Sequence, residues 1–436
     1  MSRIAVRNRQ RGFSLVELLI SLAVLVIILV GVLQLFDIHT RIARTQTNVA
    51  DMQQSLRVGQ NEMVRLIRMT GRGMLPAAHT AVTQPVTVAE RKLLPNGISV
   101  EVINDAAADA TVGGNDVVEG TDVLIIRGAI SSPIYLVDTV DTGNFVLTDL
   151  DADDIPESGV IKNVSSTPKA DRLPVDGSEL QKALTEDLTA SGGDPAALVL
   201  VSPVDNGIYA VVEVDQDTSS FTGDPAAVWS ADIGFKVSGG TNTAEYNKLS
   251  PKGEYPKELK TIAYVGLLDE YRFYVREETY TAAPGITELA PSLSVARYYP
   301  GTTKARPNEG SIDIADNILD LQIVLGIDLD QNGFINPEAD PPDPANDEWL
   351  FNADGDTDAG GDVDPLDWDD RELYYLRINT VARTDRPDLD FVSAALDWIE
   401  DRSWGEPAVP GDNQARHDRR FRRRLMQTTI DLRNLS

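Results

Sequence analysis

The chain has 436 residues, of which 39 are Lys or Arg, 68 are Asp or Glu, three are His and none is Cys. This length leaves room for one large domain or two ordinary ones. The net charge of −29 argues against nucleic acid as a partner, because phosphate groups would repel most of the chain. The lack of Cys excludes disulfide scaffolds, Cys-based zinc sites and thiol catalysis.

The charge is distributed unevenly along the chain. Residues 1–76 contain ten Arg and four acidic residues, a net charge of +6. Residues 416–436 contain seven Arg and two acidic residues, a net charge of +5, so the stretch between the two carries −40. A basic N-terminus, an acidic body and a basic C-terminal segment therefore need separate explanations.

A basic leader, residues 1–12, precedes a long apolar segment. The leader has no acid and contains Arg3, Arg7, Arg9 and Arg11. The 24 residues from Phe13 to Phe36 are mostly apolar. As a helix they would span about 36 Å, enough to cross a hydrocarbon core of about 30 Å. The arginines on one side predict a cytoplasmic N-terminus and an exported body, with the segment 13–36 in the membrane.

Two simpler interpretations of this segment are a secretory signal peptide and a plain signal anchor. The apolar run exceeds the usual ~7–15 residues of a signal peptide, and no small-residue cleavage site follows Phe36. Glu17 argues against a plain anchor, because an acid within a spanning segment costs roughly 2.5–3.5 kcal/mol unless it is paired or near the interface. An acid tolerated at the membrane edge stays open as an alternative.

Cleavage between Gly12 and Phe13 would account for the acid, because Glu17 could then pair with the new Phe13 amine of a neighbouring copy. The run Gly-Phe-Ser-Leu-Val-Glu over residues 12–17 resembles the type III signal of type IV pilins and pseudopilins. That resemblance implies cleavage and N-methylation of Phe13 by a prepilin peptidase, with Glu17 guiding the docking of the subunit into a filament.

The helix is expected to continue as an amphipathic helix over residues 37–75. One stripe with alternating spacings of four and three is apolar at all but two positions: Ile38, Ile42, Thr45, Val49, Met52, Leu56, Gly59, Met63 and Leu66. Gly71, Gly73 and Pro76 predict that the helix ends near Thr70. We expect this stripe to lie on a globular domain.

The body, residues 76–436, has the sequence pattern of an antiparallel β protein. Its β-like runs are 98–103, 122–127, 134–137, 145–147, 197–201, 208–214, 261–268, 271–276, 295–299, 373–383 and 425–432. The runs 197–201 and 208–214 predict a hairpin. Polar stretches at 104–121, 151–196, 215–228 and 339–372 predict long loops or insertions. The fold class is therefore α+β, a long helix attached to a β-rich domain in which residues 77–310 can include an inserted subdomain.

One acidic segment follows the pattern of a calcium loop. Oxygen-bearing residues alternate along it, and Gly333 at the sixth position permits a sharp turn; the expected ligands are Asp328, Asp330, Asn332, Phe334 and Asn336. The pattern departs from an EF-hand at the twelfth position, which is Ala339. A calcium loop outside an EF-hand pair is expected here, and no other cofactor is required.

A second acidic cluster contains six Asp within residues 354–367, beginning with Asp354, Asp356 and Asp358. Such a density of like charge is relieved either by a bound cation or by full solvation of the loop, and both interpretations stay open. The segment 149–154 is a weaker third case, since it has no Gly at the turn.

The C-terminal segment adds a second resemblance. Six Arg lie within residues 416–424, ahead of a run that reads Leu-Met-Gln-Thr-Thr-Ile-Asp-Leu-Arg-Asn over 425–434. This arrangement, and the segment 316–328, resemble PilW-type minor pilins. Against so acidic a body, we expect the arginines to be neutralised internally or by neighbouring subunits rather than to bind DNA.

No catalytic motif is recognisable, and His39, His79 and His417 are far apart in the sequence. The resemblances imply a structural subunit, a minor pilin of a type IV pilus, rather than an enzyme. Its partners would be the major pilin, other minor pilins, the prepilin peptidase and the inner membrane, with no small-molecule substrate. It would reach the pilus from the membrane. The alternatives are a type II secretion pseudopilin and a filament-tip adhesin that uses the acidic middle region.

Overall fold

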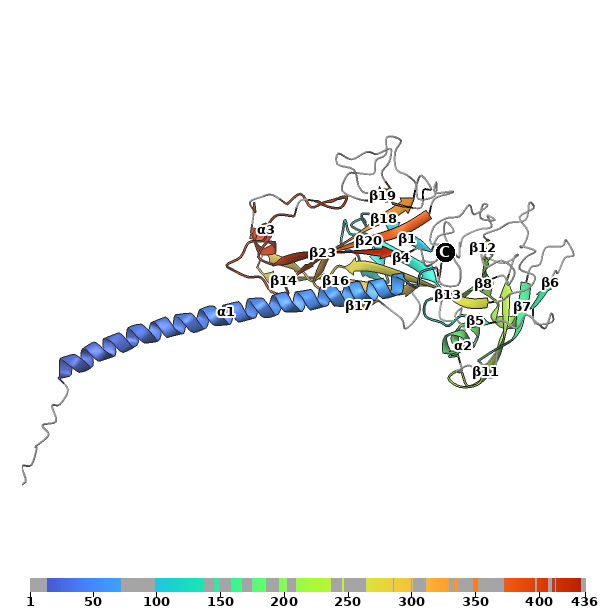
Figure 1. Cartoon of the computed structure of the whole chain (residues 1–436), viewed down its shortest axis with the longest axis horizontal. Helices are drawn as coiled ribbons and strands as arrows, with labels where there is room; N and C mark the ends of the chain where they lie inside the picture. Colours follow the sequence, from blue (N-terminus) through green and yellow to red (C-terminus); the bar gives the residue numbers. More distant parts are fainter. Residues whose placement is uncertain are drawn as a thin grey trace, which may run out of the picture.

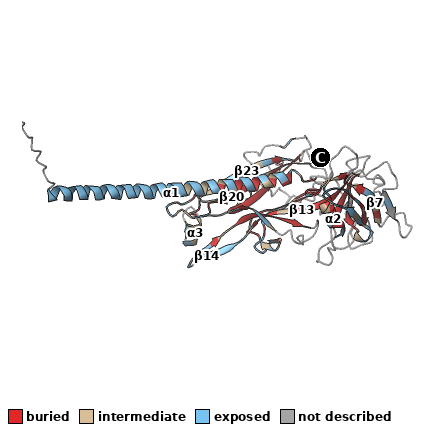
Figure 2. Ribbon diagram, turned by 90° about the horizontal axis from the view of Figure 1, so that it is seen from below, coloured by how far each residue is buried: buried red, intermediate tan, exposed pale blue. Residues whose placement is uncertain are grey.

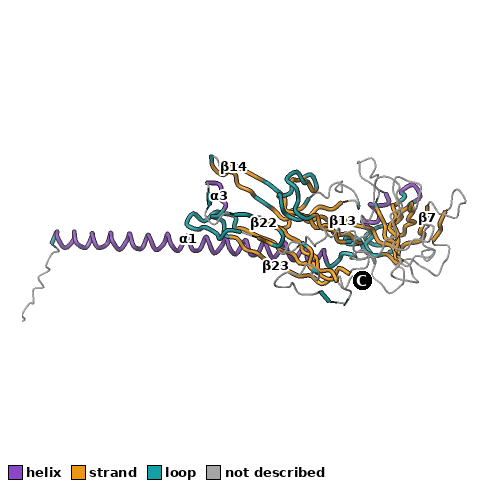
Figure 3. Tube along the Cα trace, turned by 90° about the horizontal axis from the view of Figure 1, so that it is seen from above, coloured by secondary structure: helices purple, strands orange, loops and turns teal. Residues whose placement is uncertain are grey.

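The computed structural model of the chain describes residues 14–71, 99–136, 145–148, 158–166, 175–185, 196–201, 209–236, 245–246, 264–284, 286–298, 300, 311–328, 332, 334–335, 348–351, 372–396, 398–406, 410–411 and 413–432. A single long helix projects from a body of strands and loops (Figures 1 and 3). The expected α+β class is confirmed.

The projecting helix is α1, Leu15–Ile67. Its first half is exposed along its whole length, whereas its second half lies on the body (Figure 2). The helix ends within one turn of the predicted end near Thr70, and before residue 75, where the segment assigned to it ends. Met69 and Thr70 form tighter bonds to the carbonyls three residues before them, and Gly71 adopts a positive φ of 70°, so residues 68–71 form turns.

Two antiparallel sheets make up most of the body. The larger has 13 strands: β1 Val100–Ile103, β4 Val123–Gly128, β5 Tyr135–Leu136, β6 Phe145–Thr148, β7 Ser158–Ser165, β8 Ala197–Val201, β9 Tyr209–Val214, β10 Ser220–Gly223, β11 Trp229–Lys236, β12 Glu245–Tyr246, β13 Tyr264–Arg276, β16 Ser292–Tyr298 and β17 Ile312–Asp316. The main path through it runs β1-β4-β13-β8-β9-β11-β7-β6.

The smaller sheet has the order β19-β18-β20-β23, with β19 Trp349–Leu350, β18 Ile318–Asp328, β20 Glu372–Arg383 and β23 Arg423–Asp431. Three hairpins complete the strands: β2 Thr111–Val112 with β3 Asn115–Asp116, β14 Thr279–Ala283 with β15 Ile286–Leu289, and β21 Trp398–Ile399 with β22 Arg402–Ser403. The short helices are α2 Ser178–Thr185, η2 Gln216–Thr218 and α3 Asn413–Asp418.

The hairpin predicted over residues 197–214 is confirmed, because β8 and β9 pair antiparallel in continuous register. Helices or strands lie within all four polar stretches that were predicted to be long loops or insertions. The stretch 104–121 contains β2 and β3, 151–196 contains β7 and α2, 215–228 contains η2 and β10, and 339–372 contains β19 and the first residue of β20. In β7, Ile161 and Val164 are buried among Ser and Asn residues, so the apolar signal along this strand is diluted.

Strand β13 also differs from its prediction as two separate runs. It is continuous through Asp269 and Glu270, which are both fully buried. Each acid has cationic partners: Asp269 contacts Arg297 at 2.5 Å, and Glu270 contacts Arg127 at 2.8 Å. Burial opposes ionisation of Glu270, but the neighbouring guanidinium groups hold the pKa of Glu270 below its ordinary value. Paired charges therefore let one strand continue through the two acids that separate the predicted runs 261–268 and 271–276.

The two largest hydrophobic cores lie on either side of these charges. The first contains α1 and the strands around it. The second lies entirely between Tyr135 and Leu267, away from α1. We call the described residues within 129–268 the distal lobe, and the rest of the body the proximal lobe. Since β4 and β13 pair Gly128 with Asp269, the chain leaves the proximal lobe and returns to it at one point.

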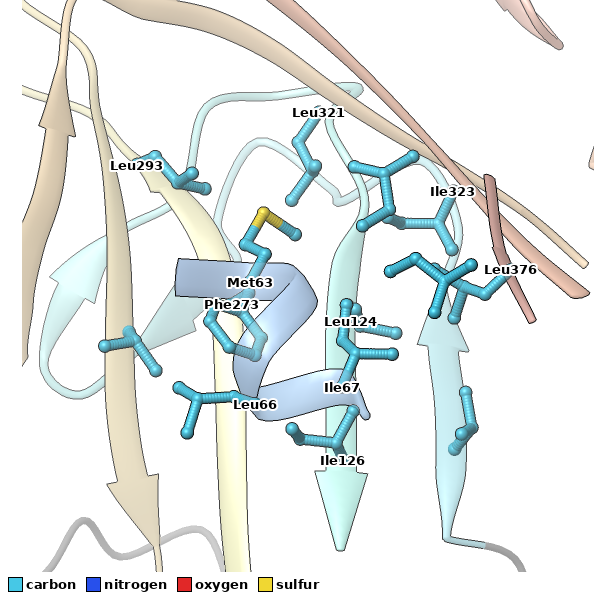
Figure 4. Packing of buried hydrophobic residues seen from close by; sticks show 14 of the residues in the cluster. Met63, Leu66, Ile67, Leu124, Ile126, Phe273, Leu293, Leu321, Ile323 and Leu376 are labelled. Atoms are coloured by element: carbon cyan, nitrogen blue, oxygen red, sulfur yellow. The ribbon is translucent and has the colours of Figure 1, made fainter. Parts of the chain in front are cut away.

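The end of α1 closes the proximal core. Met63, Leu66 and Ile67 point into a cluster lined by Leu124 and Phe273 (Figure 4). Met63 and Ile67 are completely buried, and each such side chain contributes about 1.5–3 kcal/mol when it is removed from water.

Gly59 and Gln60 fix the helix where the two sheets meet. A Cβ atom on Gly59 would lie 2.8 Å from the Cβ atom of Ala315 in β17, so only a glycine allows this approach. Gln60 is buried, and its side-chain amide donates to Thr380 Oγ1 at 2.8 Å and to the Met426 carbonyl at 3.0 Å. Thr428 Oγ1 donates back to Gln60 Oε1 at 2.7 Å.

Replacing Gln60 by Leu should lower the free energy of unfolding by about 1–3 kcal/mol, because it leaves buried polar groups of β20 and β23 without this partner. Urea denaturation of the full chain in detergent, followed by tryptophan fluorescence, measures the change. Gln54→Leu makes the same substitution on the exposed face of α1 and should change stability by less than about 0.5 kcal/mol. Equal effects of the two variants would contradict this account of Gln60.

The turn between β21 and β22 carries an acid with a displaced pKa. Burial raises the pKa of Asp401 to about 6, and the nearby Asp105 and Glu400 carboxylates add to this, although Asn104 donates a hydrogen bond at 2.7 Å. Because this pKa lies above that of an unfolded Asp, the folded state binds the proton more tightly. The resulting stabilisation is present in acid and is lost as the pH rises through about 6.

Asp401→Asn should therefore raise the melting temperature at about pH 8, where the native carboxylate is charged, and change it little at about pH 5. The amide keeps the oxygen that accepts from Asn104. Asp217→Asn, on the exposed turn η2, is the control and should show no such pH-dependent gain. A gain for Asp401→Asn that is the same at both pH values would contradict the assignment.

Candidate assembly site

The exposed half of α1 is apolar all round. Residues from Leu15 to Phe36 include 17 large apolar side chains that stay exposed, and α1 is the one helix of the described residues long and apolar enough to cross a membrane. The apolar stripe predicted for the second half is covered by the body over only part of its length, since Ile38 and Ile42 are exposed. Close packing against the body begins near Thr45 and Val49, which are half-buried.

Glu17 caps its own helix within the single chain. Its carboxylate Oε2 accepts the backbone N–H of Ser14 at 3.0 Å, and the Ser14 hydroxyl accepts the backbone N–H of Glu17 at 3.1 Å. This capping box satisfies N–H groups that the first helical turn leaves without partners. Gly12 and Phe13, the predicted cleavage site, lie outside the described residues.

An ion pair joins α1 to the body where the helix leaves it. Arg41 Nη1 lies 2.9 Å from Asp390 Oδ2, and Arg41 Nε lies 3.0 Å from Asp37 Oδ2 one turn earlier. All three side chains are exposed, so this contact contributes little to stability. It nevertheless locates the loop that contains Asp390 beside the first turn after the apolar segment.

Only part of the expected calcium loop is described. Asp328 is the last residue of β18, and its buried carboxylate accepts the N–H of Asn332 at 3.0 Å. Asn332 Oδ1 in turn accepts the N–H of Phe334 at 2.8 Å. Asp330 and Asn336 fall outside the described residues, as do Asp354, Asp356, Asp358 and the segment 149–154. Within the described residues, no three acidic or His side chains are grouped to hold a metal.

The Arg-rich segment is used inside the proximal lobe, as the balance of charge suggested. Arg422 pairs with Asp388 at 2.9 Å, and Arg423 pairs with Glu406 at 2.7 Å. Arg419 is buried and donates to the carbonyl of Ser393. These arginines anchor the loop after β20, and we infer that this is their structural role.

The two described histidines lie on different helices. His39 is exposed on α1, and His417 of α3 lies 3.2 Å from Glu288, whereas His79 is outside the described residues. The sequence reasoning missed Gln60, which joins α1 to β20 and β23. Its signal was available, because position 60 is four residues after Leu56 and three before Met63 and therefore lies on the buried face.

Residues 7–33 match the family model of the prokaryotic N-terminal methylation motif. No curated protein and no solved structure matches the chain. The matched residues contain Gly12, Phe13 and Glu17, and the exposed apolar part of α1 follows directly.

This combination supports a protein of the pilin or pseudopilin class, with a type IV prepilin-like signal and an N-terminal apolar helix that fits membrane anchoring. Within that class, the motif implies processing by a prepilin peptidase and partners among the components of the pilus.

Proposed function

We propose that the protein is a minor pilin of the PilW type, a structural subunit that helps to assemble a type IV pilus. The observation that carries the proposal is the methylation motif at the start of a helix whose apolar half is free of the body. Type II secretion pseudopilins have the same signal, so the sequence of the C-terminal segment, rather than the motif, favours the pilus.

The geometry of α1 suits transfer from lipid into a bundle of helices. Its first half is apolar on every face, so it is stable in lipid and can also pack against identical helices after extraction. The body occupies only the helix from about Thr45 onward, which leaves the first half accessible to neighbouring subunits. In the filament, the Glu17 carboxylate would exchange part of its capping interaction for the methylated amine of a neighbouring Phe13.

The mature chain should begin at N-methylated Phe13. Terminal mass spectrometry of the chain from cells with an active prepilin peptidase measures this. An intact Met1 would contradict the prepilin assignment, and so would an unmethylated first residue.

Glu17→Gln should leave cleavage and membrane insertion intact but strongly reduce the amount of the chain in sheared filaments, because the neutral amide cannot pair with an ammonium group. Asp51→Asn makes the same change at an exposed position later in α1 and should leave incorporation unchanged. Normal incorporation of the Glu17→Gln variant into filaments would contradict a role for the Glu17 carboxylate in assembly.

We also propose that the loop after β18 binds Ca²⁺. The donors available in the loop are oxygens, and the hydrogen bonds to Asp328 and Asn332 show the backbone turning back toward alternate side chains. Bound calcium would neutralise carboxylates in a body that carries a large negative charge. It would stiffen the end of β18, which is a strand of the sheet that holds α1.

Calcium should raise the melting temperature of the full chain relative to the chelator-treated protein. Asp330→Asn should remove that rise, because it deletes one charged ligand, whereas Asp217→Asn in η2 should retain it. An unchanged melting temperature in calcium and in chelator would eliminate the metal site.

A further inference from the structure

The loop between β20 and β21 presents two exposed apolar side chains at one end of the body. Leu389 is 72% exposed and Val392 is 61% exposed. Asp390, which lies between them in the sequence, is the residue that pairs with Arg41 of α1. The helix α3, which follows in the chain, also stands at the end of the body that faces the free half of α1 (Figures 1 and 2).

This loop is held firmly by the C-terminal segment. The Asp388 N–H donates to the Arg420 carbonyl at 2.9 Å, and the Ser393 N–H donates to the Arg419 carbonyl at 2.7 Å. Between these bonds, the Phe391 N–H donates to the Asp388 carbonyl at 3.0 Å. The outward direction of Leu389 and Val392 is therefore fixed by the backbone.

The loop lies at the level expected for lipid headgroups. The apolar segment ends at Phe36, and Arg41 follows five residues later, about 7.5 Å further along the helix axis. Headgroup regions extend a bilayer from about 30 Å to about 40–45 Å, so each layer is about 5–7 Å thick. The Arg41–Asp390 pair therefore falls close to the outer edge of that layer.

Charges at this level are nearly balanced, in contrast to the acidic body as a whole, because four acids share three arginines. Four acids on the loop and on the adjoining turn of α1 have an arginine partner at 2.9–3.6 Å: Asp37 and Asp390 with Arg41, Asp385 with Arg386, and Asp388 with Arg422. Paired acids are repelled less by lipid phosphates than unpaired ones. The loop therefore combines apolar side chains with ion-paired groups whose net charge, four acids against three arginines, is only −1.

We propose that Leu389 and Val392 enter the headgroup layer while α1 spans the membrane, so that the body rests on the bilayer through this loop until extraction. Amphipathic surfaces bind to that layer through apolar side chains at its boundary with the acyl chains. The proposal rests on the proposed membrane anchoring by α1. The alternative partner that could cover Leu389 and Val392 is a second copy of the chain.

The absence of Cys allows a direct test. Leu389→Cys and Val392→Cys variants of the full chain are labelled with nitrobenzoxadiazole and reconstituted at low density in phosphatidylethanolamine–phosphatidylglycerol vesicles. Both labels should show blue-shifted emission and be quenched by lipids that carry a nitroxide near the headgroup. Val228→Cys, at a 69% exposed valine of the distal lobe, is the matched control. Its label should show the emission of a water-exposed probe and should not be quenched by the nitroxide lipids.

Val30→Cys tests the anchor separately, because Val30 lies within the apolar segment. Quenching at Val30 with water-like emission at both loop positions would overturn the loop contact and leave the anchor intact. No quenching at Val30 would overturn both. Blue-shifted loop emission that depends on protein density and resists lipid quenchers would assign these side chains to a second copy. Unchanged melting temperatures establish that each labelled variant is folded.

Discussion

The contact on which the rest of the structure depends is the packing of one helix face where two sheets meet. Gly59 lets α1 approach β17, and Gln60 bonds to β20 and β23, so the same turn of the helix joins the edges of both sheets. This face of α1 packs against the body only from about Thr45 onward. One helix thus meets two different requirements, an environment of lipid or other helices for its first half and a folded body for its second.

A second constraint lies at the junction between the lobes. Asp269 and Glu270 would each be costly to bury alone, but Arg297 and Arg127 compensate their charges. Arg297 also contacts Glu179 of α2 at 3.1 Å, so this ion-pair network extends from β16 into the distal lobe. The network orients the two lobes through directional bonds at a place where neither hydrophobic core reaches.

Much of the fold was predictable where a regular period dominates the sequence. The mostly apolar run 13–36 and the stripe from Ile38 to Leu66 indicated α1, and apolar runs such as residues 197–201 indicated the central strands. Prediction failed where partners are distant in the sequence. Asp269 and Glu270 separated two predicted strands because the arginines that pair with them come from other strands. The helical period places Gln60 on the buried face, but its bonding partners lie more than 300 residues later and could not be identified. For the candidate site, the sequence indicated Glu17, and the Ser-x-x-Glu spacing from Ser14 to Glu17 is a further signal, that of the capping box which the structure contains.

The pairing of Gly128 with Asp269 has a consequence for how such a chain can vary. The entropy cost of closing a loop grows only slowly with its length, and the two ends of this one are already held together by the ladder between β4 and β13. The stability of the proximal lobe therefore depends little on the number of residues between Gly128 and Asp269. An ancestor with a short turn at this point could acquire the whole distal lobe, or exchange it for another, without altering the path of α1 or the sheet that holds it.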